Sequence, residues 1–417
     1  MKRIKILLIA YYFPPLGGAG VSRPLALFKN LSAFGIDVDV LTVKNISYRT
    51  YEPELLANLN TSRIYQTGSL DPQRILYLLG MRTLKEKTIS KGRSVIDNFF
   101  PDSKIGWVKQ ALKTGRVLVE NKQYDAILST SPPISTHLIA KKLSKEFSVP
   151  YIADFRDYWT SYKPEDWFTD TNKITKAKKL LKEICQTASK VVSVSKPIQT
   201  YLETGEVIYN SYDEERALLW KATSYGDKIY IGVLGTLDKL CPIEPLCQLL
   251  DSLRKNNSTL FEKLKVLQVG NINDPSFFET LAKYKLTEKF EIHNQQARER
   301  TIEILNKTSF LYMGLNPLYE EGIVTTRLFD MLVSGRNILA SVTEKSEVYK
   351  ILQNFPNSCC FTTDSVHIAE KFVVYQINEN KNEIIPIPEQ VLAYSSNKMA
   401  EKFSVLIQNG IYNYKKR

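Results

Sequence analysis

The chain has 417 residues, which exceeds the usual size of one hydrophobic core and predicts two domains. Its composition is globular, with 43% hydrophobic and 24% charged residues and a formal net charge of +12. Five cysteines form neither an even framework nor C-x-x-C pairs, which excludes a disulfide scaffold and favours a cytoplasmic protein. No run reaches the roughly 20 unbroken apolar residues of a membrane span, so we expect a soluble or peripheral protein.

The positive charge is concentrated in the first half. Residues 1–200 carry 31 Lys and Arg against 17 Asp and Glu, whereas residues 201–417 carry 25 against 27. Such a basic half suits an anionic membrane surface, a lipid-linked diphosphate or a nucleic acid, or it is a general solubilising charge. The chain lacks the stacking aromatics and modules of nucleic-acid binders, so no nucleic-acid partner is expected.

Short apolar runs alternate with segments of helical period, which is typical of parallel sheets covered by helices on both faces. The initial run MKRIKILLIAYYF imitates a signal peptide, but Pro-Pro-Leu-Gly-Gly follows it instead of a cleavage site, and we interpret it as the first strand. Residues 45–106 show no clear pattern and are basic. The strands expected in the first half are RIKILLIA, IDVDVLTV, DAILST, PYIADF and KVVSVS, and the helices cover residues 21–34, 107–120, 136–147 and 173–189.

A polar linker, residues 207–228, separates this alternation from a second one. The strands expected in the second half are KIYIGVLG, LKVLQVG, KFEIHN, FLYMGL and NILASV. We therefore predict two Rossmann-like doubly wound α/β domains, residues 1–205 and 206–394, that face each other across a ligand-binding cleft. A last helix, about residues 397–408, could fold back onto either domain, and we expect residues 395–417 to join the first.

The stretch IAYYFPPLGGAG, residues 9–20, leads from the first strand into a helix. Gly17 and Gly18 permit positive φ and close approach of a ligand, and a helix N-terminus attracts anions; the alternative is a merely tight turn. No complete G-x-G-x-x-G is present. Asp37 and Asp39 nevertheless lie at about the distance expected for the acidic residue of a dinucleotide site, so a dinucleotide is not excluded.

Charged residues also gather at the ends of later strands in the first half. Asp154, Arg156 and Asp157 follow PYIADF and form either an ion-paired turn or a ligand-facing cluster. His137 lies in the first turn of the helix after STSPP, where it acts as a local hydrogen-bonding group or as a base.

Two stretches of the second half suit a diphosphate. In GVLGTLDKL the chain turns at Gly235 with Lys239 near, which predicts a cradle of backbone N–H groups and one cation. In LNPLYEEGIVTTRLFDMLVSG, Arg327 stands beside a helix N-terminus. Asp330 in that helix can accept both hydrogens of a ribose diol, or it simply stabilises the first turns.

These pieces in this order resemble the family 4 glycosyltransferases of the GT-B fold, especially the bacterial members of cell-surface polysaccharide synthesis. The matching pieces span almost the whole chain: ILLIAYYFPPLGGAGVSRP, PYIADFRDYW, KVVSVSKPIQTYL, VIYNSYD, GVLGTL and TTRLFDMLVSGRNILAS. The resemblance implies an amino-terminal acceptor domain and a carboxyl-terminal nucleotide-sugar domain. It further implies sugar transfer to a glycan or lipid-linked acceptor with retention at the anomeric carbon, without a metal or another cofactor.

The resemblance, together with the motifs, assigns roles to individual residues. Arg327 would meet the donor diphosphate, and Asp330 would meet the donor ribose. The full set comprises, for catalysis, His137, Asp154, Glu321 and Arg327; for the donor, Gly17, Gly18, Gly235, Thr236, Lys239, Gly322, Ile323, Val324, Thr325 and Asp330; and for the acceptor, Arg23, Arg156 and Asp157.

The sequence also departs from the family pattern. The family has two glutamates separated by seven residues. Asp330 stands at the position of the second, shortened to an aspartate. Counted back from Asp330, the first glutamate falls on Gly322, with Glu321 one place off. Arg327 stands where lysine is common, and Thr236 where a basic residue often stands. Two alternatives therefore remain open, a non-catalytic binding protein that keeps the fold and a sugar-nucleotide epimerase on the same architecture.

Overall fold

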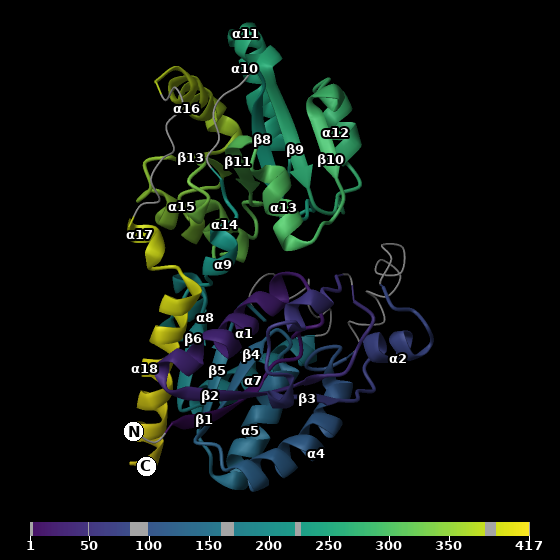
Figure 1. Ribbon diagram of the computed structural model, residues 1–417, viewed down its shortest axis with the longest axis vertical. Coiled ribbons are helices and arrows are strands. Elements are labelled where there is room, and N and C mark those ends of the chain that lie inside the picture. The colour runs from purple at the N-terminus through teal and green to yellow at the C-terminus, as the bar shows by residue number, and fades with distance from the viewer. Residues whose placement is uncertain are drawn as a thin grey trace. The chain divides into compact units, whose positions relative to one another are not determined.

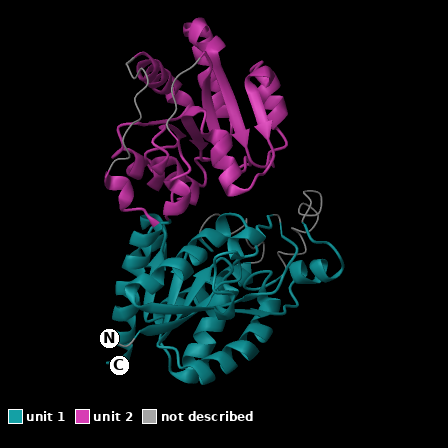
Figure 2. Cartoon of the chain, in the orientation of Figure 1, with its two compact units in different colours: residues 1–210, 396–417 teal, residues 211–395 magenta. Residues whose placement is uncertain are grey.

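A computed structural model describes residues 3–48, 50–83, 99–159, 171–221, 227–379 and 389–416. The chain divides into two compact units, one of residues 1–210 and 396–417 and the other of residues 211–395 (Figure 2). Residues 84–98, the centre of the basic segment without a clear pattern, lie outside the described residues. Among the helices of the described chain, none combines the length and the apolar character needed to cross a bilayer.

The first unit is built on a parallel sheet of seven strands in the order β3-β2-β1-β4-β5-β6-β7 (Figure 1). The predicted strands are all present, and the sequence did not predict the short strands β3 and β7. The initial apolar run is indeed the first strand. The bounds are β1 (Ile4–Ile9), β2 (Ile36–Val43), β3 (Ile64–Thr67), β4 (Ala126–Ser131), β5 (Tyr151–Phe155), β6 (Lys190–Ser193) and β7 (Glu206–Val207).

Helices cover both faces of this sheet, so the strands are apolar on both sides and appear as continuous apolar runs in the sequence. One face packs on α4 (Ile105–Lys122), α5 (Ser135–Phe147) and α7 (Thr171–Thr187). The other face packs on the end of α1 (Ala19–Asn30) and on α18 (Ser396–Lys415), the last helix of the chain. Shorter helical segments are η1 (Leu31–Phe34), η2 (Pro53–Leu56), η3 (Thr61–Arg63), α2 (Pro72–Leu78) and α8 (Lys196–Leu202).

The second unit contains a parallel sheet of six strands in the order β10-β9-β8-β11-β12-β13. All five predicted strands are present, whereas β13 was missed. Its strands are β8 (Ile229–Leu234), β9 (Leu264–Val269), β10 (Phe290–His293), β11 (Thr308–Gly314), β12 (Asn337–Ser341) and β13 (Ser358–Phe361). Its helices are α9 (Glu214–Ala217), α10 (Glu244–Asn256), α11 (Ser258–Lys263), α12 (Phe277–Lys283), η4 (Thr287–Lys289), α13 (Arg298–Leu305), α14 (Thr326–Val333), α15 (Glu347–Leu352), η5 (Thr363–Ser365), α16 (Val366–Glu379) and α17 (Glu389–Leu392).

Both sheets share one topological feature. The strand order reverses between β1 and β4 in the first unit and between β8 and β11 in the second. Open parallel sheets bind ligands beyond the carboxyl ends of their strands at such a reversal. The prediction of two doubly wound parallel sheets is confirmed, and each sheet has one edge at which to search for a site.

Candidate functional site

In the second unit, β8 ends in a turn that requires glycine. Gly235 has a φ of +90°, its N–H donates to the carbonyl oxygen of Val269 (2.8 Å), and its own carbonyl accepts from Gln268 Nε2 (3.0 Å). The guanidinium of Arg327 lies so close that a Cβ at position 235 would be 3.1 Å from its Nη2. Glycine is therefore needed here both for the backbone conformation and for the approach of the guanidinium.

Arg327 comes from the first turn of α14 and reaches back toward this turn. Its Nη2 is 3.5 Å from the carbonyl oxygen of Thr236, a weak hydrogen bond at most. Thr325 is the N-cap residue of α14, yet its buried hydroxyl makes no cap bond and has no partner in the part of the chain that is described. The first amides of α14 are thus without a side-chain cap, and a helix start of this kind attracts an anion.

The loop before α14 is held by a carboxylate that the sequence analysis did not single out. Glu320 is buried, and its carboxylate accepts from the N–H of Thr343 (3.0 Å) and from the Thr343 hydroxyl. Glu321 is exposed, and its carboxylate has no partner among the described residues. Of the two glutamates, the first positions the loop that contains Gly322, Ile323 and Val324, and the second remains available to a ligand.

Lys239 adds a second cation at the same edge of the sheet. It lies in the loop after β8, which Asn316 joins to the loop after β11 through hydrogen bonds to the carbonyl oxygens of Lys239 and Leu240 (both 2.9 Å). The side chain of Lys239 is exposed, and its ammonium makes neither a hydrogen bond nor an ion pair within the described ranges. Gly235, Arg327, Lys239 and the start of α14 therefore leave positive charge unneutralised where the strand order reverses.

Asp330, which the resemblance assigns to the donor ribose, forms an ion pair instead of standing alone. Its Oδ1 is 3.0 Å from Nη2 of Arg216 in α9. Burial raises the pKa of Asp330, while the charges of Arg216 and Arg298 oppose that rise. The ion pair fixes the orientation of the carboxylate and occupies one of its oxygens.

In the first unit, the glycine turn after β1 contains an internal carboxylate. Gly18 has a φ of +82°, and its N–H donates to Oε1 of Glu52 (3.3 Å). A Cβ on Gly17 would overlap the carboxylate of Glu52, so that side chain would have to shift. Sequence reasoning missed Glu52 because it belongs to the segment in which no periodicity was visible.

Arg23 and Asp154 form a buried ion pair between two distant segments, which neither the ion-paired turn nor the ligand-facing cluster had described. Nη2 of Arg23 is 2.8 Å from Oδ1 of Asp154, and both side chains are almost fully buried. Asp154 also accepts from the hydroxyl of Thr130 (2.7 Å), and Arg23 donates to the carbonyl oxygen of Tyr209 (2.9 Å). We therefore assign both residues a structural role, in place of catalysis for Asp154 and acceptor binding for Arg23.

Arg156 and Asp157 differ from that pair. Arg156 donates to three backbone carbonyl oxygens, those of Gly20 (2.7 Å), Ser131 (3.0 Å) and Pro132 (3.1 Å), and so joins the start of α1 to the end of β4. Asp157 is exposed at the same edge. Arg156 thus acts on the backbone, while Asp157 stays accessible.

His137 is enclosed in the first turns of α5. Its Nδ1 is 2.8 Å from Oγ of Ser129, and its ring packs against Phe155 with 4.5 Å between ring centroids. Burial lowers its pKa to about 3. A side chain with that pKa is a weak base near neutrality, so the alternative of a local hydrogen-bonding group fits the geometry better.

No group of three or more His, Cys, Asp and Glu side chains in the described ranges is arranged to hold a metal ion. Asp37 and Asp39 lie inside β2, which is the predicted strand IDVDVLTV. There Asp37 pairs with Arg3 (2.9 Å), and Asp39 pairs with Lys122 (3.0 Å). Both carboxylates are therefore engaged with protein cations.

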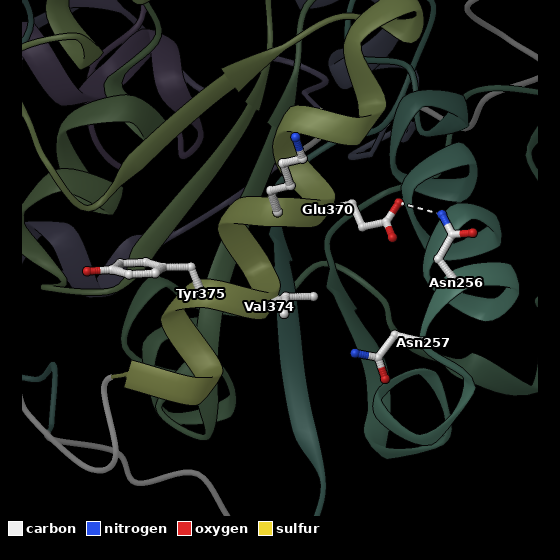
Figure 3. Close-up of a pocket in the computed structure, with 6 residues that line it drawn as sticks. Asn256, Asn257, Glu370, Val374 and Tyr375 are labelled. Carbon is white, nitrogen blue, oxygen red and sulfur yellow. Dashed lines mark hydrogen bonds between the residues drawn. The ribbon is translucent and has the colours of Figure 1, made fainter.

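A shallow hollow of about 380 Å³ lies on the second unit between α10 and α16 (Figure 3). Within it, Asn256 Nδ2 donates to Oε2 of Glu370 (3.1 Å). The hollow is lined by Asn256, Asn257, Glu370, Lys371, Val374 and Tyr375. Because β8 and β9 are parallel, α10 must return to the amino ends of the strands, so Asn256 lies far from the edge at which such sheets bind ligands. We therefore exclude the hollow from the candidate site.

No protein-family model matches the sequence, and no curated protein matches it. Solved structures do match over nearly the whole length. Sucrose-phosphate synthase from Thermosynechococcus elongatus is 12% identical with a TM-score of 0.68, over 97% of this chain and 98% of that one. Anabaena HepE in complex with UDP and glucose is also 12% identical, with a TM-score of 0.63 over 97% and 100%.

A putative UDP-N-acetylglucosamine 2-epimerase from Listeria monocytogenes is similar as well, at 11% identity and a TM-score of 0.53 over 97% of this chain and 96% of that one. At such identities the likeness establishes the fold and nothing finer. The chain has two parallel-sheet units, and in each the strand order reverses beside the first strand. This topology agrees with the architecture of the similar structures. The chain has the GT-B fold.

Proposed function

We propose that the chain is a glycosyltransferase that takes a sugar from a nucleoside-diphosphate donor. The observation that carries the proposal is the contact of the Arg327 guanidinium with the Gly235 turn, beside a start of α14 that no side chain caps. Arginine and exposed backbone amides together suit a diphosphate, which has several acceptor oxygens and at least two charges. Because the similar HepE structure contains UDP and glucose, uridine donors are the first to examine.

The proposed reaction retains configuration and needs no metal. The bond between the anomeric carbon and the diphosphate oxygen breaks, and the acceptor oxygen bonds to the same face of that carbon. The acceptor proton leaves on the diphosphate. Negative charge grows on the departing diphosphate, where Arg327, Lys239 and the amides of α14 would stabilise it. Glu321, exposed and unpaired among the described residues, would contact the transferred sugar.

We further propose that the first unit binds the acceptor, a glycan or a lipid-diphosphate-linked glycan. Its basic composition suits an acidic carrier, and Asp157 is accessible at the carboxyl edge of its sheet. The corresponding setting is the synthesis of cell-surface polysaccharide, such as capsule or lipopolysaccharide. The protein would work in the cytoplasm at the inner face of the membrane.

Calorimetry with UDP and UMP, followed by a hydrolysis screen across nucleotide sugars, tests the proposal. Arg327→Ala should weaken UDP binding about 10- to 100-fold, because a charged hydrogen bond to phosphate contributes about 1.5–3 kcal/mol. UMP, which lacks the second phosphate, should lose less. Arg300→Ala is the matched control, since Arg300 is an exposed arginine of the same unit that pairs with Glu303.

Two results would redirect the proposal. The absence of binding heat with any nucleoside diphosphate would favour the non-catalytic protein, which the glycine at position 322 already suggests. Conversion of the donor sugar to its epimer without any acceptor would favour the epimerase, which the likeness to the Listeria structure suggests.

A further inference from the structure

Helix α2 is a peripheral helix of the first unit. None of its residues is buried, and it lies at the margin of the unit (Figure 1). The chain around it exposes Leu70 (69%), Leu78 (65%) and Leu79 (79%). We define the α2 surface as the exposed apolar residues of this segment, which are Leu70, Ile75, Leu78, Leu79 and Met81.

The base of α2 is firmly attached although its apolar side chains are exposed. Asp71 caps the helix by accepting from the N–H of Arg74 (3.0 Å), and its other oxygen accepts from the buried hydroxyl of Tyr11 (2.7 Å). The N–H of Leu70 donates to the carbonyl oxygen of Gly106 in α4 (3.2 Å). The α2 surface is therefore presented at the N-terminal end of α4 on an anchored helix.

Several exposed leucines clustered within one short segment are unusual for a soluble surface, where large apolar side chains are normally scattered singly. The second unit shows the ordinary situation, with Leu218 (85%), Phe278 (61%) and Leu318 (64%) far apart in its sequence. Clustered apolar exposure of this kind marks a contact with a partner or with a lipid phase.

Two cations belong to the segment of the α2 surface, and the helices on one face of the same unit's sheet are basic. The guanidinium groups of Arg74 and Arg82 both lie over the ring of Tyr77, 5.4 and 5.1 Å from its centroid. The three helices α4, α5 and α7, which cover one face of the sheet, carry twelve Lys and Arg against three Glu. Their exposed basic residues are Lys109, Lys113, Arg116, Lys142, Lys145, Lys176, Lys178, Lys179 and Lys182.

We propose that the α2 surface inserts into an anionic lipid bilayer. Its leucines would enter the interface between headgroups and acyl chains, while Arg74, Arg82 and the lysines of α4 would contact anionic headgroups. A second copy of the chain fits this surface less well, because each copy carries +12 and like charges oppose close association. The proposal stands independently of the proposed transferase reaction, since it requires no donor.

Flotation of the purified full chain with vesicles tests the proposal without any substrate. The vesicles are neutral phosphatidylcholine, or the same lipid with about one third phosphatidylglycerol. We expect recovery with the anionic vesicles that falls as salt rises, because headgroup attraction is screened within about 10 Å at 0.1 M salt. The double variant Leu78→Asp/Leu79→Asp should lose at least about tenfold in partitioning, since two leucines would no longer transfer from water.

Matched controls separate the α2 surface from general changes in apolarity and charge. Leu218→Asp/Leu392→Asp changes two exposed leucines of the second unit and should float like the unmodified chain. Lys109→Glu/Lys113→Glu should reduce recovery, whereas Lys263→Glu/Lys345→Glu, with the same change in net charge, should reduce it less. Thermal unfolding of each variant identifies any that fail to fold. If Leu78→Asp/Leu79→Asp does not fold, the single variant Leu79→Ala replaces it.

Three outcomes would overturn the proposal. Equal recovery with neutral and anionic vesicles would contradict the role of charge. Unchanged recovery of the Leu78→Asp/Leu79→Asp variant would contradict the role of the α2 surface. A dimer in solution that this variant dissociates would show that a second copy covers the surface. Each of these leaves nucleotide binding at the second unit untouched.

Discussion

The two units present nearly the same sheet topology but opposite kinds of carboxyl edge. In the first unit the buried charged groups at that edge are satisfied internally, as in the pair of Arg23 with Asp154, whereas Asp157 is exposed. In the second unit Arg327 makes a long contact to a carbonyl oxygen and interacts with the Cys241 side chain, with no ion pair in the described ranges, and Lys239 is exposed, also without one there. The buried charges at the edge of the first unit have ion-pair partners within the protein. At the edge of the second unit, Arg327 and Lys239 have none among the described residues.

This difference separates charges that stabilise the fold from charges that could bind a ligand. In the sequence alone the two kinds look the same, because both follow the end of a strand. A buried charge is tolerated when a partner neutralises it, and its removal then damages the fold. A half-exposed cation beside an uncapped helix start contributes little to folding and much to binding an anion. Substitutions at the two edges should therefore change different measured quantities.

The largest expected effect is on the stability of the first unit. Asp154→Asn leaves the guanidinium of Arg23 buried without a counter-charge, and we expect a loss of about 3–5 kcal/mol in the free energy of unfolding. Glu183→Gln, which breaks the more exposed pair with Lys141, should cost less than about 1 kcal/mol. Urea denaturation followed by tryptophan fluorescence measures both. Equal, small losses would mean that the buried pair is not the structural element we infer.

The next effect concerns ligand binding at the second unit. In Gly235→Ala the new Cβ would press on the Arg327 guanidinium at about 3.1 Å, so we expect about tenfold weaker UDP binding together with roughly 1 kcal/mol of backbone strain. Gly35→Ala is the control, because Gly35 also has a positive φ, +76°, but nothing lies within 4 Å of its Cβ position. It should show the strain alone. If both variants bind UDP equally well, Arg327 does not contact the diphosphate.

Much of the fold could be predicted because buried parallel strands are continuous apolar runs. The run IDVDVLTV, for example, became β2 with its predicted bounds. The short strands β7 and β13 could not be predicted in this way, since Glu206–Val207 and Ser358–Phe361 are too brief to show a period. The segment after β2 was also missed, and it contains both Glu52 and α2.

The pairing of side chains was less predictable than the strands. Arg23 and Asp154 are 131 positions apart, and nothing in one sequence indicates that they meet. Glu320 and Glu321 are adjacent and chemically identical, yet one is buried on Thr343 and the other is exposed. Local patterns could locate Gly235 and Arg327 at strand and helix ends, but only the fold shows that the two touch.

The smallest expected effect concerns His137 and depends on pH. Ser129 Oγ donates to the carbonyl oxygen of Ile152 (3.2 Å) and therefore accepts from Nδ1–H of His137. Burial lowers the pKa of His137 and so favours the neutral ring, with its proton on Nδ1. With a pKa of about 3 in the folded protein and about 6.5 when unfolded, the unfolded state binds an extra proton between these values. Stability therefore falls as the pH falls below about 6.5.

Replacing this side chain should remove that share of the pH dependence. Between pH 7.5 and 5.5 the unmodified protein should lose about 1 kcal/mol more of its unfolding free energy than His137→Leu loses, whatever their difference at pH 7.5. Urea denaturation of both proteins at the two pH values measures the difference, in which the contributions of other groups cancel. Equal losses would show that His137 takes up a proton in the folded state. A charged His137 would then be tolerated in the first unit, beside a carboxyl edge at which we infer that buried charges need an ion-pair partner.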